Sequence, residues 1–211
     1  MPNRELALEL YRKMAPRYDR GGARPPFPEL RRRAVEHLEL QPGQSVIDAG
    51  SGTGLALPLL EDAIAPEGRI IAIDQSPEML EEARKLIERS GWQNVTVIES
   101  PVEEADIPGE VDAALFALSH DIMRSRQAVE NVVSHVKPGG RISAVGMTWN
   151  PWWALPFNIV HAWRLRRGAT TYEGLGRPWT HLEKLVPLQV KRVFRGFKGG
   201  YYFAWGVRPS A

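Results

Sequence analysis

Residues 45–64 constrain the fold more than any other part of the chain. Ser45–Ala49 is short and apolar and predicts a buried strand, and residues 55–64 predict a helix. Glycines at alternate positions separate the two: Gly50, Gly52 and Gly54. Such glycines let the main chain approach a ligand closely, because no Cβ atom stands in the way. The helix that follows presents free N–H groups at its N-terminus. We therefore expect a ligand site at this turn.

Two acidic residues end the predicted strands on either side of this site. Asp48 lies at the C-terminal end of the first strand, where open α/β sheets bind ligands, and its carboxylate suits an ammonium group. Asp74 ends the apolar strand Arg69–Asp74, 20 residues after Gly54, a spacing at which a carboxylate can reach a ribose diol. The glycine pattern is G-x-G-x-G, whereas dinucleotide folds require G-x-G-x-x-G; Leu55 stands in the place of the third glycine.

This combination resembles motif I of the class I S-adenosylmethionine-dependent methyltransferases. The likeness continues with Asp74, with the sequence VKPGG at 136–140, and with MAPRYD at 14–19, which is similar to the quinone-biosynthesis branch of that family. It covers roughly residues 10–148. The resemblance implies an α/β, Rossmann-like, doubly wound sheet of seven strands in the order 3-2-1-4-5-7-6, with strand 7 antiparallel.

The 211 residues fit a single domain with a sizeable core. We expect an N-terminal helical cap at 1–42, a cofactor-binding core at 43–148, a helical insertion covering the acceptor at 149–180, and closing strands at 181–211. The remaining predicted strands are 94–99, 111–118, 140–147, 188–195 and 200–207. The remaining predicted helices are 5–14, 29–40, 77–89 and 122–136, the last with Asp121 as N-cap.

The resemblance also implies which residues contact the cofactor, S-adenosylmethionine. They are Tyr18, Asp48, Gly50, Ser51, Gly52, Thr53, Gly54, Asp74, Gln75, Met79, Pro101, Val102, Glu103, Leu118 and Ser119. Many relatives carry an aspartate at the position of Pro101, which accepts a hydrogen bond from the adenine amino group. Pro101 cannot do so, which leaves the N–H of Val102 or the side chain of Glu103 for the adenine ring. Core filling is the alternative role for Met79.

His120 is the predicted catalytic base. It follows the fourth predicted strand, where this fold faces the transferred methyl group, and an ordinary histidine pKa near 6.5 suits removal of a proton. The alternative is that His120 caps the next helix or packs beneath the substrate.

Residues 149–179 hold five of the seven tryptophans, with arginines interleaved. Large aromatic surface beside cations suits a flat or apolar acceptor with an anionic group. The predicted acceptor contacts are Tyr11, His120, Met147, Trp149, Trp153 and Phe157. Three alternatives stay open: a helical cap with its own core, a homodimer interface, and peripheral membrane contact through 149–167.

Composition limits the other possibilities. With no cysteine, the chain has no disulfide, thiolate metal site or cysteine nucleophile, and no cluster of carboxylates and histidines compels a metal. From the polar start we expect no signal peptide, and the apolar run at 152–163 is too short and broken to span a bilayer, so we expect a cytoplasmic protein.

Charge is unevenly distributed along the chain. Residues 1–130 hold 15 Lys and Arg against 23 Asp and Glu, a net charge of −8, whereas residues 131–211 hold 12 against 2, a net charge of +10. The asymmetry either is incidental or indicates an anionic substrate, a membrane surface or nucleic acid. No recognised RNA-binding appendage is present, so nucleic acid is not expected.

The sequence thus favours a methyltransferase that moves a methyl group to a small aromatic, quinone-like, polyketide or lipid-like acceptor by in-line displacement. One rival is a non-catalytic cofactor-binding or nucleic-acid-binding module on the same fold. The other is a nicotinamide-dependent oxidoreductase, which the G-x-G-x-G pattern and the lack of a Tyr-x-x-x-Lys pair disfavour.

Overall fold

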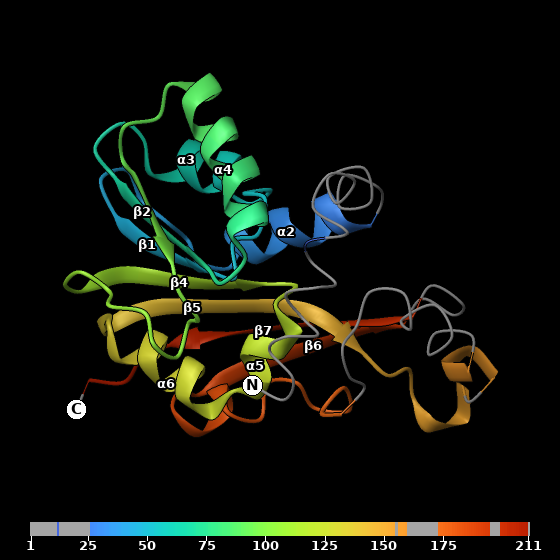
Figure 1. Ribbon diagram of the computed structural model, residues 1–211. Helices are drawn as coiled ribbons and strands as arrows, with labels where there is room; N and C mark the ends of the chain where they lie inside the picture. The colour runs from blue at the N-terminus through green and yellow to red at the C-terminus, as the bar shows by residue number, and fades with distance from the viewer. Residues whose placement is uncertain (1–11, 13–25, 155, 160–172, 195–198, 211) are drawn as a thin grey trace.

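Within the residues that the structure describes, seven strands form one sheet in the order β3-β2-β1-β4-β5-β7-β6 (Figure 1). The structure is a computed structural model, and it describes residues 12, 26–154, 156–159, 173–194 and 199–210. The strands are β1 Ser45–Ala49, β2 Arg69–Asp74, β3 Val95–Glu99, β4 Val111–Ala117, β5 Val136–Thr148, β6 Leu188–Phe194 and β7 Gly200–Val207. Strands β1 to β5 are parallel, and β7 runs antiparallel to both β5 and β6. The predicted strand order and the antiparallel β7 are confirmed.

Helices cover both faces of the sheet. They are α2 Phe27–Glu36, α3 Leu57–Ile64, α4 Pro77–Ser90, α5 His120–Arg124 and α6 Arg126–Ser134, with 3-10 turns η1 Trp152–Ala154 and η2 Leu182–Lys184. α2 and α3 pack on one face, and α5, α6 and η2 pack on the other. Alternate residues of the central strands enter the two cores: Ile70 and Ala72 one core, Ile71 and Ile73 the other. Burial on both faces explains why β2 is continuously apolar.

Helix α4 begins and ends as its sequence predicts. The Ser76 hydroxyl accepts a hydrogen bond from the Met79 N–H at 3.4 Å, and Pro77 occupies the first turn. Gly91 ends the helix with φ +72°, in the left-handed region that favours glycine.

The predicted helix 122–136 is wrong, and so is the role of Asp121 as its N-cap. The chain forms two shorter helices instead, because Ser125 is extended and interrupts the run. The Ser125 hydroxyl then accepts from the Ala128 N–H at 3.2 Å and caps α6. Asp121 consequently lies inside the first turn of α5, at the edge of the sheet where β4 ends.

Several other boundaries differ by a few residues. α3 begins at Leu57 rather than at residue 55, because the turn after the glycines extends to Ala56. α2 ends before residue 40, since Glu39 has a positive φ of +47°. β5 begins at Val136, which pairs with Val111. The predicted helix 5–14 lies outside the described residues except for Arg12, and so do residues 155 and 160–172 of the predicted insertion.

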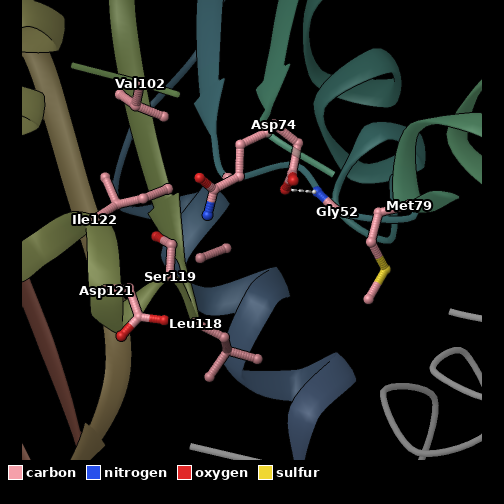
Figure 2. A pocket seen from close by; sticks show the side chains of 11 residues that line it. Gly52, Asp74, Met79, Val102, Leu118, Ser119, Asp121 and Ile122 are labelled. Atoms are coloured by element: carbon pink, nitrogen blue, oxygen red, sulfur yellow. Dashed lines mark hydrogen bonds between the residues drawn. The ribbon is translucent and has the colours of Figure 1, made fainter. Parts of the chain in front are cut away.

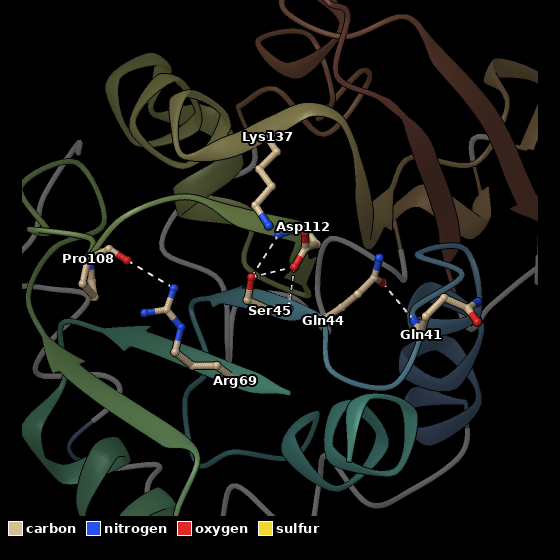
Figure 3. A network of polar contacts seen from close by, with 7 residues as sticks. All are labelled: Gln41, Gln44, Ser45, Arg69, Pro108, Asp112 and Lys137. Carbon is tan, nitrogen blue, oxygen red and sulfur yellow. Dashed lines mark hydrogen bonds and ion pairs between the residues drawn. The ribbon is translucent and has the colours of Figure 1, made fainter. Parts of the chain in front are cut away.

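A polar network joins the N-terminal ends of β1, β4 and β5, at the edge opposite the glycine turn (Figure 3). One carboxylate oxygen of Asp112 accepts from both the N–H and the hydroxyl of Ser45 at 2.8 Å, and the other accepts from Lys137 at 2.5 Å. Asp112 thus ties three strands together through a single side chain.

We expect Asp112→Ala to lower the free energy of unfolding by about 1–3 kcal/mol, because it removes the shared acceptor of these donors. Urea denaturation followed by circular dichroism measures the change. The matched control is Asp106→Ala, at an exposed loop position, which should have almost no effect. Equal stability of the two variants would show that the network contributes nothing.

Candidate functional site

A cavity opens at the C-terminal ends of β1, β2 and β4 (Figure 2). Its walls are Gly50, Gly52, Asp74, Gln75, Met79, Val102, Ala117, Leu118, Ser119, Asp121 and Ile122. A smaller hollow shares part of this wall. It is lined by Arg31, Asp48, Gly50, Ser51, Gly52, Thr53, Leu55, Ala56 and Ala117. Together the two hollows bring most of the predicted cofactor-binding residues to one place.

The glycine turn forms the floor between the two hollows. Gly50 has φ +81°, and a Cβ atom there would lie 2.6 Å from Ile122 Cδ1, so only glycine lets the turn approach α5. Gly52 has φ +56°, and a Cβ atom there would meet nothing within 4 Å. Its backbone therefore faces open space on the cavity side. Gly54 packs instead against Leu57 and lies outside both linings.

Asp74 is held in place by backbone donors. Its carboxylate accepts from the Gly52 N–H at 2.9 Å (Figure 2). It also accepts from the Ser76 N–H at 2.9 Å. Burial raises the pKa of Asp74, and these backbone hydrogen bonds act to lower it. The side chain therefore links the end of β2 to the glycine turn and keeps a fixed orientation beside the cavity.

Asp48 is buried without a hydrogen bond. It is 1% exposed, and neither carboxylate oxygen has a hydrogen-bond partner among the described residues. Burial raises its pKa to about 7, the nearby charge of Arg31 lowers it, and Asp74 raises it. An orphaned buried carboxylate is costly and marks a position where a ligand can supply the missing donor.

Arg31 joins this group from α2, although it is not among the residues predicted from the sequence. It is 6% exposed and lines the smaller hollow together with Asp48. Arg31 lies four residues before the buried Val35, on the inward side of the helix. The sequence could have indicated this role, because Arg31 falls on the inward side of the predicted helix. A buried arginine usually has a charged or polar partner.

The turn after β4 forms the opposite wall of the cavity. Leu118 has φ +62°, which is unusual for a residue other than glycine, and its N–H donates to the Val145 carbonyl at 2.7 Å. The hydroxyl of Ser119 is buried with no partner among the described residues. Asp121 and Ile122 also line the cavity, and neither was predicted to do so, since the start of α5 was misplaced.

His120 lies between two lining residues but contacts a different segment. Its Nε2 lies 3.2 Å from the Glu173 carbonyl oxygen. Because a carbonyl can only accept, Nε2 carries the proton and Nδ1 is the basic nitrogen. Burial lowers the pKa of His120, so the ring is neutral at pH 7. Arg124, one turn further on, pairs with the Glu173 carboxylate at 2.5 Å.

Most of the other predicted residues do not line the cavity. Val102 lines the cavity, whereas its neighbours Pro101 and Glu103 are absent from the described lining. The predicted acceptor contacts in the described part of the chain also lie outside that lining: Met147, Trp149, Trp153 and Phe157. Tyr11 and Tyr18 lie outside the described residues. Nowhere in the described ranges do three His, Asp or Glu side chains gather where they could hold a metal ion.

Known proteins share this arrangement. Residues 46–140 match the methyltransferase domain family. Protein-L-isoaspartate O-methyltransferase of Aeropyrum pernix is 35% identical over 113 residues, which are 52% of this chain and 41% of that protein. Demethylmenaquinone methyltransferase of Listeria welshimeri is 24% identical over 161 residues, which are 73% of this chain and 68% of that protein. The chain thus spans less than half of the Aeropyrum relative.

A solved structure shares the fold over almost the whole chain. The N-methyltransferase NodS of Bradyrhizobium japonicum, in complex with S-adenosyl-L-homocysteine, gives a TM-score of 0.70 at 17% identity. The likeness covers 97% of this chain and 99% of that one. At this identity it shows the Rossmann-like sheet, and the site must be argued from the residues themselves.

The unpartnered Asp48 predicts a specific dependence of stability on pH. Its folded-state pKa of about 7 lies above the ordinary value of 3.8, so its contribution to stability is full below pH 4 and is lost as the pH rises toward 7. We expect Asp48→Asn to raise the free energy of unfolding of the ligand-free protein at pH 8 by about 1–4 kcal/mol. The difference from wild type should open between about pH 4 and pH 7 and stay constant above.

Thermal and urea unfolding between pH 4 and pH 8 measure this difference. The control is Asp62→Asn, because Asp62 is exposed on α3. If Asp48→Asn follows the same pH curve as the control, Asp48 is not an unpaired buried acid.

Proposed function

We propose that the protein is an S-adenosylmethionine-dependent methyltransferase that acts by in-line displacement on a small acceptor. The observation that carries the proposal is the pair Asp48 and Asp74, which end neighbouring strands on either side of the glycine turn. The match of residues 46–140 to the methyltransferase domain family supports it. Dinucleotide binding is disfavoured because Leu55 stands in place of the third glycine.

The smaller hollow suits the amino acid end of the cofactor. That end carries an ammonium and a carboxylate, and Asp48 and Arg31 offer one charge of each sign within the same hollow. An ammonium would supply the donors that Asp48 lacks among the described residues. Burial strengthens both interactions, because little water competes for the charges.

The larger cavity suits the nucleoside. Asp74 would accept from the ribose hydroxyls while the Gly52 and Ser76 N–H groups hold its orientation. Gln75, Met79, Val102 and Ile122 would surround the adenine, and Leu118 and Ser119 would face the methyl end. Ser51, Thr53, Tyr18, Pro101 and Glu103 stay in the proposed set as peripheral contacts, with Gly54 as a packing residue.

The chemistry requires little of the protein beyond placement. The sulfonium of the cofactor supplies an already activated methyl group. The residues of this site would bind and orient the two reactants and exclude water between them. The buried Ser119 hydroxyl and the Asp121 carboxylate lie on the wall beyond Leu118, where an acceptor would approach.

The proposed acceptor is small and aromatic, quinone-like, polyketide or lipid-like. Support comes from the tryptophan-rich stretch after β5, and the likeness to a demethylmenaquinone methyltransferase agrees with it. Relatives with other named acceptors, such as the isoaspartate enzyme, match no less closely. We propose Met147, Trp149, Trp153 and Phe157, together with Tyr11, as the residues that cover it.

His120 is the proposed base for an acceptor that must lose a proton. Its lowered pKa keeps the ring neutral at pH 7, and the Glu173 carbonyl orients it through Nε2. Nδ1 then remains as the proton acceptor. Its chain neighbours Ser119 and Asp121 line the cavity, which supports a role for His120 at the edge of the cavity.

Replacing Asp74 tests the ribose assignment. We expect Asp74→Asn to weaken binding of S-adenosylhomocysteine by about 10- to 100-fold, because a charged acceptor is lost while the side chain keeps its size. Isothermal titration calorimetry measures the dissociation constant.

The matched control is Glu99→Gln, since Glu99 ends β3 directly opposite Asp74 in the register of the sheet. It is exposed and pairs with Arg84, so its loss should leave affinity unchanged. Equal weakening by both variants would mean that general charge at this edge, and not the ribose contact, sets the affinity.

Replacing His120 tests the proposed base. We expect His120→Gln to lower turnover about 100-fold while affinity for S-adenosylhomocysteine stays within about twofold, because the base acts only on the acceptor. Turnover is measured as S-adenosylhomocysteine formation with a panel of phenols and prenylated quinones. In wild type, the lowered pKa of His120 should keep turnover high to a pH below 6.5, with an acid limb that the variant lacks.

His135→Gln is the control for this experiment. His135 follows the end of α6, and its Nδ1 lies 2.8 Å from the Asn131 carbonyl oxygen in the same helix. Undiminished turnover of His120→Gln, with the acid limb retained, would remove His120 as a base.

A further inference from the structure

Exposed apolar side chains gather on one part of the described surface. Trp153 is 59% exposed, Ile159 is 64% exposed and Phe194 is 42% exposed. The Phe194 ring contacts Trp153 edge-on at 5.2 Å between centroids and Phe157 at 5.8 Å. We call Trp153, Phe157, Ile159 and Phe194 the aromatic rim. Exposed apolar side chains that gather in this way on a protein surface mark an interaction site.

The aromatic rim lies at the same edge of the sheet as the cavity. β6 and β5 are both antiparallel to β7, so they run in the same direction. Phe194 at the end of β6 pairs with Gly200, and Gly200 pairs with Thr148 at the end of β5. β5 is in turn parallel to β4, whose end forms the cavity wall. Figure 1 shows η1 projecting beyond the end of β5 at this edge.

The charge around the aromatic rim is positive. β6 is the edge strand and exposes Lys191 and Arg192 just before Phe194. Arg192 lies on the same face of the strand as Phe194 and donates to the Trp149 carbonyl, whereas Lys191 lies on the other face. Residues 131–211 hold twelve Lys and Arg against two Asp and Glu. Both acids are already paired, Glu173 with Arg124 and Glu183 with Arg177. Two of the twelve cations pair with acids of the first 130 residues, Lys137 with Asp112 and Arg141 with Glu39. The excess of cations that remains favours an anionic partner.

We propose that the aromatic rim docks on an anionic lipid surface, so that the cavity receives an acceptor dissolved in the membrane. Tryptophan and aliphatic side chains flanked by cations favour the boundary between headgroups and acyl chains. Pairing with a second copy through β6 is disfavoured, since a lysine on an edge strand opposes it. This inference rests on the proposed function in one respect, namely that the molecule taken from the membrane is the methyl acceptor. No helix in the described ranges is long and apolar enough to cross a bilayer.

The test is flotation of the full chain with vesicles of phosphatidylcholine alone and of phosphatidylcholine with one quarter phosphatidylglycerol. We expect binding to the anionic vesicles and little binding to the neutral ones. Ile159→Ser should weaken binding about fivefold, because an exposed apolar side chain no longer enters the lipid. Its matched control is Val207→Ser, since Val207 is also exposed, at 42%, but lies at the opposite end of the sheet.

A charge comparison completes the test. Lys191→Gln should weaken binding to the anionic vesicles about fivefold, as one cation near a charged surface does. Lys85→Gln, on α4 in the acidic half of the chain, should not change it.

Three outcomes would overturn the proposal. The first is no binding to anionic vesicles. The second is equal binding by the Ile159→Ser and Val207→Ser variants. The third is binding of the aromatic rim to something else: a dimer in light scattering that Ile159→Ser dissociates, or a structured RNA in place of vesicles. Calorimetry with S-adenosylhomocysteine on the same preparations keeps the two ideas separate, because vesicle binding without cofactor binding would sustain the docking and reject the methyltransferase.

Discussion

A carboxylate buried without a hydrogen bond is the feature on which the rest of the site depends. Asp48 is the penultimate residue of β1 and is 1% exposed, with no hydrogen-bond partner for either oxygen in the described part of the chain. Such a group destabilises the ligand-free fold unless it is protonated, which is why burial raises its pKa to about 7. Arg31 offsets part of the cost from α2. A cationic ligand group would offset the rest, so the same unfavourable burial that weakens the empty protein would strengthen binding.

The sheet makes this burial possible. Its central strands are apolar on both faces and leave their polar ends at one edge, where the glycine turn and the strained Leu118 expose backbone to the cavity. At the other edge, Asp112 closes the network that holds β1, β4 and β5 in register. Stability thus resides in the cores and at the far edge, while the ligand edge retains unsatisfied groups.

Sequence reasoning succeeded where local patterns are strong. The strand order follows from the family resemblance. The acids near the ends of β1 and β2 and both ends of α4 follow from apolar runs, glycine spacing and capping residues. It failed where tertiary contacts decide. Ser125 divides the helix that the apolar periodicity predicts as continuous. The position of Asp121 in the cavity wall was therefore not predicted. Arg31 was not predicted because its burial beside Asp48 depends on the packing of α2 against β4 and β5, which no local sequence pattern indicates.

The most direct measurement is calorimetric titration of the wild-type protein with S-adenosylhomocysteine near pH 7, repeated in buffers of different ionisation enthalpy, with NADH titrated in parallel. The account predicts a dissociation constant on the order of micromolar for S-adenosylhomocysteine and no binding of NADH. It also predicts release of about half a proton on binding, because Asp48 must ionise to meet the ammonium. Binding of NADH, or binding of S-adenosylhomocysteine with no proton released, would contradict it.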